Sequence, residues 1–287
     1  MPDTPFTLTM PSPRSSGVIF ASPHSGRDYP WSFLRTSTLD ERAIRSSEDA
    51  FVDRLFDTAP RHGAPLLAAR LPRAFVDLNR GADELDPSVV EGVRHIAHNP
   101  RVSSGLGVIP RVVANGRAIY RGKISLVEAR TRLAEVWTPY HSTLQRLLSD
   151  AKREFGHAIL IDCHSMPHEA IDAISAGGRA PDVVLGDRFG AACGPDIIDR
   201  IEAAFTRAGL RVARNAPFAG AYVTQHYGRP SKGQHVVQVE IDRALYMSER
   251  DVRPNAGFGD LRRALADVIA EVVEIGRPEQ TMTLAAE

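Results

Sequence analysis

Short apolar segments that resemble strands alternate with longer amphipathic segments along most of this chain. The strand segments are rich in Val, Ile and Leu and show little polar alternation, which is typical of parallel sheets covered on both faces. We therefore predict an α/β sandwich with a largely parallel sheet. The predicted strands are 17–24, 64–71, 73–79, 158–163, 182–185, 210–213 and 235–241, and the predicted helices are 50–59, 125–155, 196–208 and 261–275.

The domain organisation follows from the absence of an internal repeat or a linker-like change in composition. We predict a single α/β domain over 17–276, a flexible Pro- and Ser-rich leader over 1–16, and a C-terminal tail over 277–287. The irregular stretch 81–122 is too long for an ordinary connection, so we expect it to fold over a site as a lid or loop region.

The strongest predicted helix, 125–155, contains a proline near its middle. Pro139 lacks a backbone donor, so it should kink or divide the helix. Tyr140 and His141 follow it, and packing of the helix is a sufficient explanation for both.

Composition and charge exclude several classes of function. Lys and Arg (35) balance Asp and Glu (35), so there is no net positive charge to attract nucleic acid or a membrane surface. The two cysteines, Cys163 and Cys193, are too few for a disulfide framework and suit a reducing compartment. No apolar run reaches the length of a membrane span. We therefore expect a cytoplasmic protein whose partner is a small molecule.

Polar residues gather where four of the predicted strands end, in the segments 22–26, 77–80, 162–166 and 238–242. In open α/β sheets, ligands bind beyond the carboxyl ends of the strands. Strand alternation places Asp162 and His164 on one face and Cys163 on the opposite face. Cys163 is thus predicted to be a buried core thiol, and a nucleophile formed by Cys163 with His164 is disfavoured.

His24, His164 and a carboxylate from the segment 47–49 could converge on a metal ion. Two histidines and one carboxylate, with an open fourth position, are typical of catalytic zinc in hydrolases. Either histidine could instead be a hydrogen-bonded structural residue, and the residue types alone leave both alternatives open. The chain contains no HExxH, no phosphate-binding GxxxxGK[ST] and no GxSxG motif.

Several ordered motifs between about residues 17 and 250 resemble those of a known family. They are SPHSGRDYP (22–30), SEDAFVDRLF (47–56), LPRAFVDLNR (71–80), PYHSTL (139–144), IDCHSMP (161–167) and GAYVTQHYGRPSKGQHVVQVEIDRALYM (220–247). This series resembles the N-formylglutamate amidohydrolase family. The resemblance implies a zinc-dependent hydrolase with a mixed-sheet, three-layer α/β/α fold, similar to carboxypeptidase A-like and aspartoacylase-like enzymes.

The resemblance also implies a metal site with one zinc ion per chain. Carried over by position, its ligands are His24, Asp49 and His164, with Glu48 as the alternative acidic ligand. The wider relatives take the acidic ligand from an HxxE motif, whereas Arg27 stands at that position here.

Substrate and catalytic roles follow from the same resemblance. Asn79 and Arg80 match a pair that holds a substrate carboxylate, a role that suits the fork of a guanidinium. Glu240 matches the general base that takes a proton from the attacking water. Arg111 could hold a second carboxylate, and Tyr222 and His226 could contact the acyl group. For each of the three, the alternative is a structural role as a hydrogen-bonded loop or core residue.

The function predicted from these residues is zinc-dependent hydrolysis of N-formyl-L-glutamate to formate and glutamate, the last step of one histidine-degradation route in the family. One alternative is a metal-dependent amidase or carboxypeptidase acting on another N-acyl amino acid or a cell-wall peptide. Another is a non-catalytic carboxylate-binding protein that has kept the fold. The sequence makes no prediction of oligomeric state.

Overall fold

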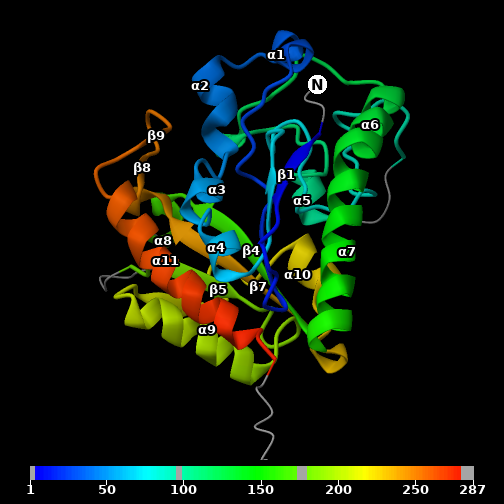
Figure 1. Cartoon of the computed structure of the whole chain (residues 1–287). Helices are drawn as coiled ribbons and strands as arrows, with labels where there is room; N and C mark the ends of the chain where they lie inside the picture. Colours follow the sequence, from blue (N-terminus) through cyan, green and yellow to red (C-terminus); the bar gives the residue numbers. More distant parts are fainter. Residues whose placement is uncertain (1–3, 95–98, 173–179, 279–287) are drawn as a thin grey trace, which may run out of the picture.

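A seven-stranded mixed sheet forms the centre of the computed structural model, which describes residues 4–94, 99–172 and 180–278 (Figure 1). The strands are β1 (Phe6–Thr9), β2 (Val18–Ser22), β3 (Leu66–Ala69), β4 (Ala158–Met166), β5 (Val183–Gly186), β6 (Val212–Arg214) and β7 (Gln234–Asp242). Their order in the sheet is β1-β3-β2-β4-β7-β5-β6. β1 pairs antiparallel with β3, and β5 pairs antiparallel with β7, while the other neighbours are parallel. The prediction of a mixed, mostly parallel sheet is confirmed.

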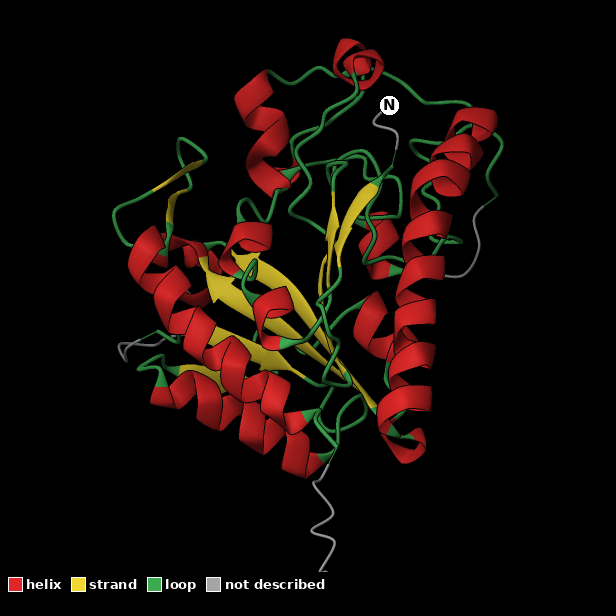
Figure 2. Cartoon of the chain, viewed as in Figure 1, coloured by secondary structure: helices red, strands yellow, loops and turns green. Residues whose placement is uncertain are grey.

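Helices cover both faces of this sheet, which gives the three layers of an α/β/α sandwich (Figure 2). They are α1 (Trp31–Thr36), α2 (Glu41–Ile44), α3 (Val52–Leu55), α4 (Ala59–His62), α5 (Pro100–Ser103), α6 (Leu126–Arg132), α7 (Thr138–Phe155), α8 (His168–Asp172), α9 (Pro195–Arg207), α10 (Tyr222–Tyr227) and α11 (Phe258–Ile275). A short hairpin, β8 (Met247–Ser248) and β9 (Arg253–Pro254), lies apart from the main sheet. No helix in the described ranges is long and apolar enough to cross a membrane.

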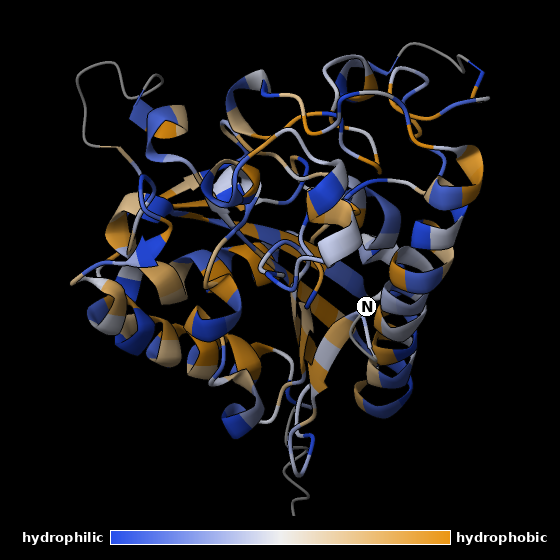
Figure 3. Ribbon diagram, turned by 90° about the horizontal axis from the view of Figure 1, so that it is seen from above, coloured by the Kyte–Doolittle hydropathy of each residue, from blue (hydrophilic) through white to orange (hydrophobic). Residues whose placement is uncertain are grey.

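Two hydrophobic cores lie on opposite faces of the sheet, as the alternation of strand side chains requires. Val18 and Phe20 of β2 pack in the core beneath α9 and α11, whereas Ile19 and Ala21 pack in the core beneath α7 and α10. The apolar colouring of Figure 3 follows the strands at the centre of the molecule. Both faces of the central strands are therefore dry, which explains their continuous apolar composition.

The predicted helix 125–155 is helical throughout but divided before its proline. α6 leads into a π-helical segment, Leu133–Trp137, and α7 begins at Thr138 with Pro139 in its first turn. The backbone stays helical through this junction, and the wider π-helical turn before Pro139 accommodates a residue that has no N–H to donate. α7 ends at Gly156, which adopts a left-handed conformation with φ of 77°.

The predicted strand 73–79 was wrong. Pro72 accepts backbone hydrogen bonds from Phe75 and Val76, so the chain coils into a turn after β3 instead of continuing as a strand. This turn gives Asp77, Asn79 and Arg80 a compact arrangement that an extended strand would not allow.

The expectation of a flexible leader over 1–16 was also wrong for part of that segment. Phe6–Thr9 form the edge strand β1, in register with Leu66–Ala69 of β3. Backbone pairing to β3 orders this segment, and Phe6 and Leu8 pack against the core that contains α7. Composition alone does not reveal such pairing. Most of the predicted tail, 279–287, lies outside the described residues.

The irregular stretch 81–122 is anchored by its own apolar residues. Val89, Val90, Val108 and Ile109 are buried in the same core as α7. It is therefore a packed part of the molecule over its described residues, and its role as a lid remains a prediction.

Gly26, four residues after the end of β2, lies against the backbone of the segment that follows β3. A Cβ atom there would lie 2.0 Å from the carbonyl oxygen of Leu71 and 2.7 Å from the carbonyl carbon of Arg70. We predict that Gly26→Ala lowers the free energy of unfolding by about 1–3 kcal/mol, because backbone atoms must move to admit the methyl group. Thermal or denaturant unfolding measures the change.

Gly122→Ala is the matched control, because a Cβ atom at Gly122 meets nothing within 4 Å. Equal stability of the two variants would contradict the close approach at Gly26.

Candidate active site

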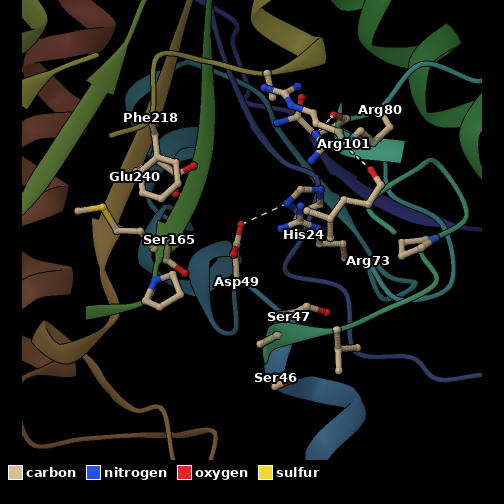
Figure 4. Close-up of a pocket in the computed structure, with 18 of the residues that line it drawn as sticks. His24, Ser46, Ser47, Asp49, Arg73, Arg80, Arg101, Ser165, Phe218 and Glu240 are labelled. Atoms are coloured by element: carbon tan, nitrogen blue, oxygen red, sulfur yellow. Dashed lines mark hydrogen bonds and ion pairs between the residues drawn. The ribbon is translucent and has the colours of Figure 1, made fainter. Parts of the chain in front are cut away.

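A cavity of about 520 Å³ opens beyond the carboxyl ends of β2, β4 and β7, a size usual for small-molecule sites. Figure 4 shows His24, Asp49 and Glu240 around it, with arginine side chains on a further side. The residues of 101–116 and 217–221 that line it form its outer walls. The polar strand ends singled out in the sequence therefore do meet at one site.

The pairing of β4 with β7 arranges the floor of the site. His164 lies beside Glu240, and Asp162 lies beside Gln238, in the parallel register of these strands. Cys163 packs in the core on the opposite face and is fully buried. The predicted division of this strand between a polar face and an apolar face is confirmed.

His24, Asp49 and His164 form a buried cluster suited to a cation. Asp49 Oδ2 lies 2.9 Å from His164 Nδ1 and 3.4 Å from His24 Nδ1. One potential ligand atom from each residue lies within 4.8 Å of the others. His24 Nδ1 is buried and makes no hydrogen bond with the described residues. The cluster therefore contains an imidazole nitrogen that is free to coordinate a metal ion.

A second carboxylate holds the outer nitrogen of each ring. Asp77 Oδ1 lies 2.7 Å from His24 Nε2, and Asp162 Oδ2 lies 3.0 Å from His164 Nε2. Both carboxylates are buried. Metal-binding histidines commonly contact a carboxylate in this way, which fixes the ring orientation. Asp77 and Asp162 were not among the site residues predicted from the sequence, although strand alternation places Asp162 on the same face as His164.

The electrostatics of the cluster favour a positive charge at its centre. Burial would raise the pKa of Asp49, but its hydrogen bond with His164 and its ion-pair contact with His24 outweigh burial and hold this pKa well below the usual range. Burial would lower the pKa of His164, but Asp162 and Asp49 raise it well above its usual value. A cation between the rings would satisfy the same carboxylates.

Asp49, and not Glu48, faces the two histidines. The Glu48 carboxylate accepts a hydrogen bond from the Tyr29 hydroxyl at 2.6 Å and pairs with Arg45 Nε at 3.0 Å. Asp49 is further oriented by Arg243, whose Nη2 donates to Asp49 Oδ1 at 2.9 Å. The geometry thus favours Asp49 between the two acidic candidates.

Glu240 faces the cavity beside this cluster. Gln238 Nε2 donates a hydrogen bond to Glu240 Oε1 at 2.9 Å. Burial raises the pKa of Glu240 to about 7, with the positive charge of His164 opposing the rise and Asp49 adding to it. A carboxylate with such a pKa can both accept and return a proton near neutral pH.

Asn79 and Arg80 line the cavity and are both buried. Asn79 Oδ1 accepts from the Val223 backbone at 2.8 Å, and its Nδ2 lies 3.2 Å from His164 Nε2. Arg80 donates through Nε to the Leu106 carbonyl and through Nη1 to the Asn79 carbonyl. Nη2 of Arg80 makes no hydrogen bond with the residues that the structure describes, which leaves it available to a ligand.

Helix α7 and the π-helical segment before it hold the backbone of these two residues. Trp137 Nε1 donates to the Arg80 carbonyl at 2.9 Å, and His141 Nε2 lies 3.0 Å from the Leu78 carbonyl. Burial lowers the pKa of His141 to about 3, so the ring is neutral and can also accept from the Tyr227 hydroxyl. Packing alone was therefore an incomplete explanation of His141.

Three predicted contacts with substrate do not reach the cavity. Arg111 Nε pairs with Asp86 at 2.9 Å, and its Nη2 donates to the Ser103 carbonyl, so this guanidinium holds the stretch 81–122 together. Tyr222 stacks on the exposed ring of His226, with centroids 4.9 Å apart. None of these three side chains is among those that line the cavity.

Among the described residues, three arginines that were not predicted from the sequence also line the cavity: Arg73, Arg101 and Arg243. Arg73 and Arg243 lie within the quoted motifs, which could have marked them. Arg101 lies in the irregular stretch, where no motif or periodicity distinguishes it from other arginines.

Comparisons with known proteins agree with this geometry. The family model described as N-formylglutamate amidohydrolase matches residues 16–247. The chain belongs to the N-formylglutamate amidohydrolase family. The resemblance seen in the sequence motifs is confirmed, and this member of the family is a hydrolase that acts on an amide bond.

Individual relatives cover nearly the whole chain. It is 35% identical over 261 residues to N-formylglutamate deformylase of Pseudomonas aeruginosa, covering 90% of this chain and 91% of that protein. It is 30% identical to N-formylglutamate deformylase of Pseudomonas putida, covering 82% and 83% of the two chains. The crystal structure of N-formylglutamate amidohydrolase from Ralstonia eutropha JMP134 matches with 34% identity and a TM-score of 0.89, covering 95% and 98%.

The contact of Trp137 with the Arg80 carbonyl can be tested by Trp137→Phe, which keeps an aromatic ring but removes the donor. We predict a loss of about 1 kcal/mol in the free energy of unfolding. We also predict a higher KM for the amide substrate, because Arg80 loses a backbone anchor. Thermal unfolding and steady-state kinetics measure the two effects.

Trp31→Phe provides the same substitution at the chain's other tryptophan, which is 70% exposed. Identical behaviour of the two variants would contradict a positioning role for Trp137.

Proposed function

We propose that the protein is a zinc-dependent N-formyl-L-glutamate amidohydrolase that produces formate and glutamate. The observation that carries this proposal is the buried His24–Asp49–His164 cluster beside Glu240. Relatives named N-formylglutamate deformylase at 35% and 30% identity support the substrate.

The residues fit a metal ion. Two imidazole nitrogens and one carboxylate oxygen are the donor set of catalytic zinc sites, and a side open to the cavity leaves room for water or substrate. The unsatisfied Nδ1 of His24 and the carboxylates behind both rings support this assignment. Manganese, cobalt or iron could use similar ligands. When bound, zinc supplies a Lewis acid that polarises the amide carbonyl and acidifies water.

Glu240 is the proton carrier in the proposed reaction. It accepts a proton from the attacking water while the water oxygen bonds to the formyl carbon. It then delivers that proton to the amide nitrogen as the C–N bond breaks, so one water and one amide yield formate and the free amine. Its pKa of about 7 suits both transfers.

Two arginines assist the proposed reaction by binding the substrate and stabilising developing charge. Arg80 holds the α-carboxylate through its free Nη2, which makes the attack effectively intramolecular. Arg73 lines the cavity near His24, and its Nε is fixed by Asp77 at 2.9 Å (Figure 4). Its remaining N–H groups would stabilise the negative charge that develops on the carbonyl oxygen.

The proposal predicts formate release from N-formyl-L-glutamate by the purified protein. Treatment with a chelator should abolish the release, and added zinc should restore it, because the ligand cluster must be filled for turnover. Formate assays before and after chelation test this directly.

Undiminished release by protein shown to be free of metal would contradict the metal requirement. Firmly bound zinc with no formate release would instead favour the alternative of another N-acyl amino acid or peptide substrate. Protein that binds amino-acid carboxylates but hydrolyses no amide would support the non-catalytic alternative.

Two substitutions separate metal binding from proton transfer. His24→Ala should lose stoichiometric zinc as well as turnover, because it removes a ligand. Glu240→Gln should retain zinc but lower kcat by about 10²- to 10⁴-fold, because it removes only the proton carrier. Metal analysis and kinetics on both folded variants measure the outcome.

Stoichiometric zinc in His24→Ala would remove this residue from the ligand set. A near-normal rate in Glu240→Gln would remove this residue as the base.

A further inference from the structure

Two guanidinium groups in the cavity have no carboxylate partner. Arg73 pairs with Asp77, and Arg243 pairs with Asp49. Arg80 and Arg101 also line the cavity, yet neither forms an ion pair with any residue that the structure describes. Only 6% of Arg80 is exposed, whereas Arg101 lies at the exposed rim on α5. A buried arginine without a counter-ion is costly unless a ligand supplies the negative charge.

The two arginines lie close enough to affect each other. Figure 4 shows them next to one another, across the His24 ring from Glu240. Burial lowers the pKa of Arg80, whereas the negative charge of Asp77 raises it. The positive charges of Arg73 and Arg101 lower this pKa further. Negatively charged ligand groups bound at Arg80 and at Arg101 would relieve this repulsion.

Hydrogen bonds fix the segment that carries Arg101 relative to Arg80. Glu84 accepts from the Gly81 backbone at 2.8 Å and from Asn99 Nδ2 at 3.0 Å. Asn99 in turn caps α5 by accepting from the Arg101 backbone at 3.0 Å. Both oxygens of Glu84 are thus committed to these contacts. Arg101 therefore belongs to a built wall of the cavity, and its side chain makes no hydrogen bond with the described residues.

The chemistry of the substrate supplies a use for a second cation. A formylated dicarboxylic amino acid has one carboxylate next to the scissile amide and another at the end of its side chain. Arg80 is the buried cation beside the proposed metal cluster, and Arg101 is the cation nearer the opening of the cavity. The spatial order of the two arginines matches the order of the two carboxylates.

We propose that Arg101 binds the side-chain carboxylate of the substrate and thereby selects acidic N-formyl amino acids. This inference rests on the proposed function, since it assigns the second half of the same substrate. It also gives the stretch 81–122 a role in binding the second carboxylate of the substrate. The sequence had suggested Arg111, another residue of this stretch, for that role.

The test compares N-formyl-L-glutamate with N-formyl-L-glutamine, which has the same shape but an uncharged side chain. Arg101→Gln should lower kcat/KM for the glutamate derivative by about 10- to 100-fold, the range expected for one charged hydrogen-bonded pair. It should lower kcat/KM for the glutamine derivative much less, because the uncharged amide forms only a weaker hydrogen bond with Arg101. Arg101→Lys should retain part of the preference, because it keeps the charge but loses the fork.

Arg121→Gln is the matched control, because Arg121 is an exposed arginine of the same stretch that does not line the cavity. It should preserve the preference for the glutamate derivative. Thermal unfolding verifies that each variant is folded.

Equal losses on both substrates in Arg101→Gln, or no loss on either, would overturn the assignment. A calorimetric measurement separates this result from failure of the proposed function. Zinc-loaded Glu240→Gln, with and without Arg101→Gln, is titrated with each formyl amino acid. A binding preference for the acidic ligand that disappears with Arg101→Gln supports the proposal even if the wild-type protein releases no formate. No such preference, or one that survives Arg101→Gln, overturns it.

Discussion

The parallel pairing of β4 with β7 is the constraint on which the site depends. This register sets His164 beside Glu240 and Asp162 beside Gln238 on one face, while the alternate residues pack in a dry core. A shift by one residue in either strand would turn its polar side chains into that core. The seven-stranded sheet and its two helical layers therefore serve to hold two polar strand ends side by side.

Burying this many ionisable groups requires each to have a partner. Asp49 lies between His24 and His164, Asp77 and Asp162 hold the outer ring nitrogens, and Arg243 orients Asp49. Removing any one of them would leave an uncompensated buried charge. Two buried groups at the cavity are exceptions among the described residues: His24 Nδ1 makes no hydrogen bond, and the Arg80 guanidinium forms no ion pair. They face the places where a metal ion and a substrate are proposed to bind. The polar groups that lack a protein partner thus lie where the proposed reaction takes place.

The walls of the cavity come from segments with little regular structure, and each is fixed by long-range contacts. α7 and the π-helical segment before it hold the carbonyls of Leu78 and Arg80, and the Leu106 carbonyl accepts from Arg80. Rigid elements can position a site to within a fraction of an ångström, whereas free loops cannot. Anchoring of this kind lets an irregular segment such as 81–122 contribute to specificity.

Much of this protein could be predicted from local sequence. Strand alternation separates Cys163 from His164, and polar residues at strand ends mark His24, Asn79 and Glu240, because both signals depend only on neighbouring residues. Tertiary structure decided the rest. Four features depend on contacts with residues distant in the sequence. They are the turn at 73–79, the edge strand 6–9, the orientation of Asp49 rather than Glu48 toward the histidines, and the presence of Arg101 rather than Arg111 at the cavity. The chemistry of a guanidinium allows it either to pair with a carboxylate such as Asp86 or to line a cavity. Only the folded backbone determines which of these places a given arginine reaches.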